Sequence, residues 1–160
     1  MGHAFTVTFD YRCPFAYNGN AAVVRALQGG ADHDVRFAVF SLDQNHAALT
    51  DEDAPPVWER PPAERGSGVL ALLYGIAVRD HDPDRITDLA HDPATLATLA
   101  AEHTEMVRDH SVFGVPTFVA HGQATFVRFM ERGNVDDLER MLDLLAWSNL
   151  NEFKRTTLPY

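Results

Sequence analysis

Cys13 is the only cysteine of the chain, and its surroundings suit an activated thiol. An alternating apolar and polar segment ends just before it, and Pro14 suits the first turn of a helix. The sulfur would then lie at a helix N-terminus, where free N–H groups and the positive end of the dipole favour a thiolate. Because the thiolate attacks disulfides and electrophilic carbons, we predict that Cys13 is a nucleophile. The alternative is a buried cysteine that packs as a small hydrophobic residue.

The neighbours of Cys13 limit the kind of chemistry. Arg12 adds a positive charge beside the sulfur, and Ala16 stands where a Cys-x-x-Cys motif carries its second sulfur. The chain therefore cannot form an internal disulfide. We predict a monothiol mechanism, in which Cys13 forms a mixed disulfide with a low-molecular-weight thiol and a second thiol from solution releases it. Asp10 is either a proton acceptor near the sulfur or the polar end of a strand, and we favour the strand end.

Two histidines are weaker candidates. His103 and His110 are seven residues apart, which places them on one side of an expected helix. His110 lies six residues before Pro116, so it could approach Cys13 and stabilise a thiolate or shuttle a proton. The alternative is a pair of partly buried histidines that are satisfied by hydrogen bonds. No histidines are closely paired beside a carboxylate, so we predict no metal site.

Composition limits the function classes. A chain of 160 residues with 46% hydrophobic content is long enough for one ordinary core. The formal net charge of −10 argues against general nucleic-acid binding. The sequence contains neither an apolar run of the roughly 20 residues that span a membrane nor a secretory signal, so we predict a cytoplasmic protein without membrane contact. The apolar face of the last expected helix fits either a monomer core or a homodimer.

The elements that position these residues follow an α/β pattern. Apolar and polar residues alternate over 5–10 and again over 35–41, which predicts two strands. A helix over residues 14–28 joins them, so the strands pair in parallel through a right-handed crossover. Residues 43–62 are polar and rich in proline and are predicted to form a loop. The later elements are predicted as helices over residues 63–79 and 93–110, strands over 117–120 and 124–129, and a last helix that Asn134 caps.

Two short motifs carry a resemblance to a known family. Cys13-Pro14-Phe15-Ala16 is similar to the Cys-Pro-x-Cys active site of the DsbA family. Gly114-Val115-Pro116-Thr117-Phe118 resembles the loop that carries the cis-proline of that family. Phe40-Ser41-Leu42 and the tail over residues 151–155 resemble its cytoplasmic FrnE-like branch, which includes mycothiol-dependent reductases. With the order of the elements, the resemblance to the DsbA family covers nearly the whole chain.

The resemblance implies a thioredoxin fold with a shortened helical insert. Residues 1–62 and 111–160 would form the two parts of the thioredoxin domain, and residues 63–110 the insert. The implied activity is that of a thiol–disulfide oxidoreductase whose substrate is a small-molecule thiol or disulfide. Glutathione or mycothiol would be the co-substrate, and no cofactor would be bound tightly.

The resemblance also implies roles for individual residues. Pro14 would shape the helix start, and Phe15, Val115 and Thr117 would line the mouth around the sulfur. A cis bond before Pro116 would leave the Val115 backbone free to pair with a substrate. The alternative is an ordinary trans proline that opens a strand.

Two further functions stay open. The first is a conjugating or isomerising enzyme like the kappa-class glutathione transferases and the chromene-carboxylate isomerases, in which Cys13 would orient a bound thiol instead of bonding to it. The second is a non-catalytic binding module that has kept the groove and lost the redox chemistry.

Overall fold

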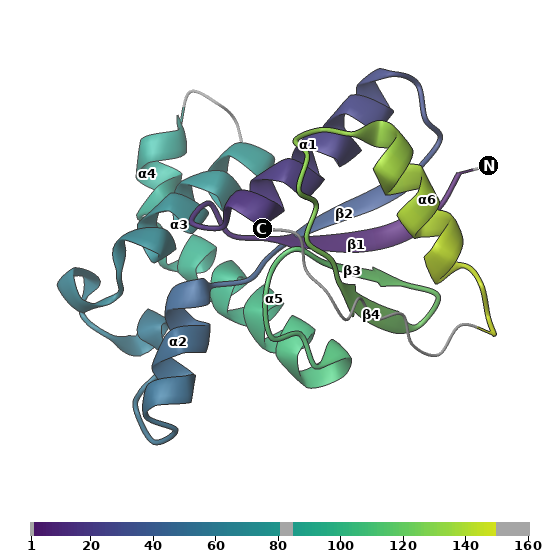
Figure 1. Cartoon of the computed structure of the whole chain (residues 1–160). Helices are drawn as coiled ribbons and strands as arrows, with labels where there is room; N and C mark the ends of the chain where they lie inside the picture. Colours follow the sequence, from purple (N-terminus) through teal and green to yellow (C-terminus); the bar gives the residue numbers. More distant parts are fainter. Residues whose placement is uncertain (1, 81–84, 150–160) are drawn as a thin grey trace.

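A four-stranded mixed sheet organises the chain (Figure 1). The computed structural model describes residues 2–80 and 85–149, so the predicted resemblance of the tail over residues 151–155 lies outside the described residues. The strand order is β2-β1-β3-β4; β1 and β2 are parallel, and β3 is antiparallel to both β1 and β4. The strands are β1 (Ala4–Phe9), β2 (Asp34–Val39), β3 (Thr117–Ala120) and β4 (Gln123–Phe126).

Helices cover both faces of this sheet. Helices α1 and α6 pack together over one face, and α5 lies against the other (Figure 1). The core beneath α1 and α6 includes Val7, Val23, Phe118 and Leu138, each with almost no exposed surface. None of the helices in the described part of the chain combines the length and apolarity needed to cross a bilayer. The bounds are α1 (Pro14–Gln28), α5 (Pro93–His110) and α6 (Val135–Leu145).

Further helices lie between β2 and β3 and build a second core. Buried side chains of α3 meet those of α5 there, with Leu72, Ile76 and Leu99 fully enclosed. The predicted order, β-α-β followed by helices and then β-β-α, is confirmed. The elements between β2 and α5 are α2 (Leu42–Thr50), the short 3-10 helices η1 (Val57–Glu59) and η2 (Pro62–Glu64), α3 (Ser67–Asp80) and α4 (Ile86–Ala90).

The predicted loop over residues 43–62 is wrong in its first half, because α2 begins at Leu42. Ser41 caps this helix, and its hydroxyl accepts a hydrogen bond from the Gln44 N–H at 3.2 Å. The helix buries none of its residues, so it lacks the apolar periodicity that identifies a helix in a sequence. The helix predicted over 63–79 begins only at Ser67, and the strand predicted over 35–41 ends at Val39.

His103, on α5, packs against the segment that follows β2. Its Nδ1 accepts a hydrogen bond from the Ser41 N–H at 3.1 Å, and its ring lies against Phe40 and Trp58 with centroids 4.5 and 5.4 Å away. The side chain is buried, and this burial lowers the pKa of His103 to about 4. The histidine is thus a satisfied core residue, as one of the two interpretations of the sequence predicts.

Acidification is therefore expected to destabilise the protein through His103. The unfolded chain binds a proton near pH 6.5 and the folded chain only near pH 4, so stability is complete above pH 6.5 and falls as the pH drops toward 4. The loss from this residue is about 3 kcal/mol. Urea unfolding of the native protein and of His103→Gln, followed from pH 7.5 to 4.5, measures it. Equal pH slopes in the two proteins between pH 6.5 and 5 would contradict the assignment.

Candidate active site

Cys13 is the N-cap residue of α1, and its sulfur lies beside a loop from the far end of the chain. The residue is half-buried, and Pro14 occupies the first turn. Its Sγ donates a hydrogen bond to the Val115 carbonyl oxygen at 3.2 Å, across 102 residues of sequence. The side chain makes no capping hydrogen bond, so it leaves the first N–H groups of α1 without that partner. These groups can stabilise negative charge on the sulfur.

The Val115–Pro116 loop is held in place from both of its sides. The peptide bond between these two residues is cis. The Thr117 hydroxyl donates to the Gly114 carbonyl at 2.7 Å, and the Thr117 N–H donates to the Thr8 hydroxyl at 2.9 Å. Thr117 is buried, so its side chain shapes the loop from within, whereas the Val115 carbonyl faces the sulfur.

Ala16 lies directly beneath this junction. Only 1% of its surface is exposed. A residue at this position is therefore shielded from solvent, while Cys13, three residues earlier, is partly accessible. The small side chain packs into an apolar cluster between the sheet, α5 and the proline loop, formed with Ala38, Phe40, Met106, Val112 and Val115.

Asp10 and Arg12 hold the turn that carries Cys13. The two carboxylate oxygens of Asp10 accept hydrogen bonds from the backbone N–H groups of Arg12 and Leu42 at 2.8 and 2.9 Å. This arrangement favours the interpretation of Asp10 as the polar end of β1. The Arg12 guanidinium pairs with Asp43 in the first turn of α2, and this carboxylate neutralises the charge that the sequence places beside Cys13.

His110 is not brought into hydrogen-bonding contact with Cys13. It ends α5 and is half-buried. Its positive form helps to lower the pKa of Glu105 and of Asp109, although each of these shifts is caused first by a hydrogen bond to an arginine. Among residues 2–80 and 85–149, no three His, Cys, Asp or Glu side chains gather to hold a metal ion.

Arg128 is a residue of this site that the sequence did not indicate. Its guanidinium carbon lies 5.2 Å from the centre of the Phe15 ring and 5.7 Å from that of Phe126. Phe126 in turn packs on Phe113, with centroids 5.2 Å apart. Within the described part of the chain, Arg128 makes no ion pair. A single arginine after a short strand carries no sequence signal, and only the fold places it beside the Cys13 motif.

The comparison with known proteins was made by sequence and by structure. Neither a protein-family profile nor a curated protein matches the sequence. A structure of 2-hydroxychromene-2-carboxylate isomerase aligns with a TM-score of 0.56 and 13% identity over 91% of this chain and 97% of that one. The oxidised T176V mutant of DsbA1 aligns with a TM-score of 0.50 and 12% identity over 88% of this chain and 85% of that one.

The fold is DsbA-like. It is a thioredoxin fold with helices inserted between β2 and β3, as the resemblance implied. Identities this low establish the fold alone, so the chemistry of the site depends on the residues of this chain. In the DsbA-like fold, these residues place the N-cap cysteine of α1 beside the proline loop, and an exposed arginine over the ring of Phe15.

Proposed function

We propose that the chain is a thiol–disulfide oxidoreductase that works through the single sulfur of Cys13. One observation carries the proposal: the partly accessible Cys13 occupies the N-cap position of α1, and its sulfur lies 3.2 Å from the Val115 carbonyl oxygen. The helix end supplies N–H groups that stabilise a thiolate, and the backbone of Val115 is an edge on which an extended substrate can pair. The buried Ala16 supplies no second sulfur.

The proposed reaction exchanges one disulfide for another. The Cys13 thiolate attacks one sulfur of a disulfide, forms a new S–S bond to it, and releases the second sulfur as a thiolate that takes a proton from solvent. A low-molecular-weight thiolate then attacks the sulfur attached to Cys13. This second step regenerates the Cys13 thiolate and forms a small disulfide between the external thiol and the substrate sulfur that Cys13 carried. Attack of a second external thiol on this mixed disulfide completes the reduction, so two external thiols are oxidised for each disulfide that is fully reduced.

We propose glutathione or mycothiol as this external thiol, without tight binding. The resemblance of residues 40–42 to the FrnE-like branch supports mycothiol, whereas the position of Arg128 supports a thiol with carboxylates, such as glutathione. A reducing cytoplasm would supply either thiol in excess.

Intact-mass spectrometry tests the proposal directly. The native protein, incubated with glutathione disulfide or mycothiol disulfide, is expected to gain one adduct that maps to Cys13 and disappears on addition of the matching free thiol. Coupled turnover of a small disulfide is measured in parallel. Absence of an adduct from both disulfides under non-denaturing conditions, with full labelling after unfolding, would refute the proposal in favour of a binding module.

The identity of the thiol is expected to depend on Arg128. Arg128→Gln should raise the glutathione concentration needed for half-maximal turnover by about two- to fivefold, the range of an exposed charge pair. Mycothiol carries no carboxylate, so its turnover should not change. Steady-state kinetics with both thiols measures the difference. Arg132→Gln is the matched control, because Arg132 also lies over an aromatic ring of α1, 4.3 Å from the centre of Tyr17, but not over the Phe15 ring next to Cys13. Equal effects on the two thiols would contradict a carboxylate contact.

A further inference from the structure

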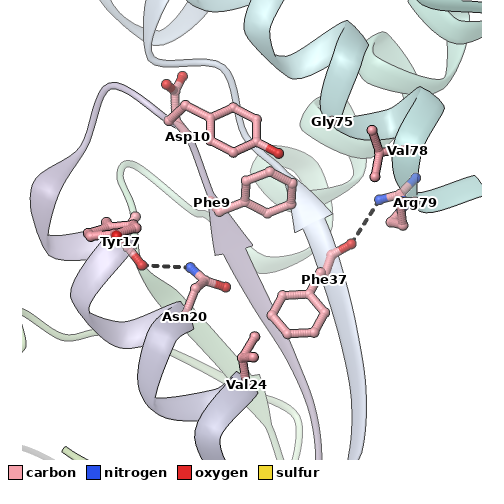
Figure 2. A pocket seen from close by; sticks show the side chains of 11 residues that line it. Phe9, Asp10, Tyr17, Asn20, Val24, Phe37, Gly75, Val78 and Arg79 are labelled. Atoms are coloured by element: carbon pink, nitrogen blue, oxygen red, sulfur yellow. Dashed lines mark hydrogen bonds between the residues drawn. The ribbon is translucent and has the colours of Figure 1, made fainter. Parts of the chain in front are cut away.

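An apolar cleft of about 460 Å³ lies between α1, α3 and the ends of β1 and β2 (Figure 2). Its walls are mainly aromatic and aliphatic, with Phe9 and Phe37 from the strands, Val24 from α1 and Val78 from α3. Cys13 does not line this cleft. Its volume falls within the range of small-molecule binding sites, about 300–1,000 Å³.

The charged groups at the walls of the cleft are already satisfied. The Arg79 guanidinium donates to the Phe37 carbonyl at 2.8 Å (Figure 2) and is paired with Asp80 and Glu102. The Asp10 carboxylate accepts its two backbone hydrogen bonds. No unpaired charge in this wall is therefore left to attract an ion, and an uncharged ligand is favoured.

Among the described residues, Asn20 presents the one buried side-chain polar atom that has no hydrogen-bond partner. Its Nδ2 donates to the Ala16 carbonyl at 2.8 Å, which leaves Oδ1 on the other side of the amide without a partner. Oδ1 is buried, and Figure 2 shows the side chain pointing from α1 toward the strands. A buried acceptor without a hydrogen bond is destabilising, because it has lost its contact with water and gained no partner. A donor that reaches it after a small rotation about χ2 removes this cost.

We infer that the cleft binds a small uncharged aromatic molecule that bears a hydroxyl group, with this hydroxyl donating to Asn20 Oδ1. The rings of Phe9 and Phe37 supply the apolar and aromatic contacts, and the amide oxygen supplies the orientation. A ligand of the same shape without a donor fills the same space but leaves Oδ1 unpaired. The cleft is therefore expected to bind an aromatic alcohol more tightly than the methyl ether of the same alcohol.

The probe pair is 2-naphthol and 2-methoxynaphthalene, titrated into the full chain labelled with ¹⁵N. 2-Naphthol is expected to bind about tenfold more tightly than the ether, the value of one hydrogen bond to a buried acceptor. The side-chain amide signal of Asn20 should shift with 2-naphthol. Equal affinities for the two probes, or shifts that spare Asn20, would overturn the inference.

Variants distinguish the cleft from general apolar binding. Asn20→Leu should bind the two probes equally. Val78→Trp, which fills the cleft from α3, should remove binding of both, whereas Val107→Trp, at another exposed valine outside the cleft, should change neither. Unchanged binding in Val78→Trp would overturn the inference even if Asn20→Leu fails to fold. The same titration of Cys13→Ser is expected to match the native protein, which separates this site from the proposed redox chemistry.

Discussion

Replacing Cys13 with serine is expected to abolish mixed-disulfide formation and to reduce thiol-dependent turnover to the rate of uncatalysed exchange. Cys13 is the only sulfur nucleophile in the chain, since its other sulfur atoms belong to methionine thioethers. A serine hydroxyl remains protonated at neutral pH and forms no bond with a disulfide sulfur. The measurements are the intact mass after incubation with glutathione disulfide and the initial rate of disulfide reduction with excess glutathione.

The substitution should leave the fold intact, which makes the result interpretable. Cys13 occupies the N-cap of α1 without a capping hydrogen bond, and serine is among the preferred N-cap residues. The serine hydroxyl can accept from an N–H of the first turn, so Cys13→Ser is expected to match or exceed the native stability by about 1 kcal/mol. Urea unfolding checks this control.

The same variant distinguishes the proposed oxidoreductase from an enzyme that only orients a bound thiol. In a transferase or isomerase mechanism, a hydroxyl at position 13 donates a hydrogen bond to the sulfur of the bound thiol as well as a cysteine does. Turnover of a glutathione-dependent isomerisation that persists in Cys13→Ser, with no covalent adduct on the native protein, would therefore replace the proposed mechanism.

The sequence predicts the sheet and the main helices because their signals are local. Alternation over residues 5–10 and the predicted N-cap Asn134 are properties of short stretches, and Asn134 accepts the expected hydrogen bond from the Asp137 N–H. Asp92, directly before Pro93, caps α5 in the same way and accepts from the Ala94 N–H.

The helix α2 also has a local signal, because Ser41 followed by Gln44 matches the sequence pattern of a capping box. The structure forms the half in which the Gln44 N–H donates to the Ser41 hydroxyl, whereas the Gln44 side-chain oxygen accepts from the Val57 N–H. The polar residues after Ser41 conceal this signal. Because α2 buries none of its residues, its sequence lacks the apolar repeat of about 3.6 residues that identifies a helix.

The site is less predictable, because its contacts join distant segments. The motif that contains Cys13 and the loop that contains Val115 identify the junction, but the partner of Arg12 is Asp43, and a sequence does not show which carboxylate an arginine meets. Gly19 gives a second example. Glycine lowers the helix propensity of α1, yet the helix is continuous through it. A glycine suits this position because a β-carbon there would lie 3.1 Å from the Phe129 ring. Only tertiary packing explains such a residue.

Replacing Ala16 with cysteine is expected to convert the monothiol site into a dithiol site. Position 16 is three residues beyond Cys13 in the first turn of α1, so the two side chains lie on the same side of the helix. Mild oxidation should form a 13–16 disulfide, with loss of 2 mass units. Because an intramolecular thiol replaces one from solution, the lifetime of the glutathione adduct should fall by about a hundredfold or more. Intact mass after rapid alkylation follows both species.

Burial determines how this variant works. Ala16 is almost fully enclosed, so the added sulfur should cost about 1–3 kcal/mol of stability and should be reached only by the Cys13 sulfur. Ala22→Cys is the matched control: position 22 is equally buried on α1 but lies about two and a half turns beyond Cys13, so this variant should keep a long-lived adduct on Cys13. A stable glutathione adduct on Cys13 in the Ala16→Cys variant would mean that the two sulfurs cannot meet. The geometry proposed for the first turn of α1 would then be wrong. The absence of a sulfur at position 16 would not be the feature that distinguishes this site from a dithiol site.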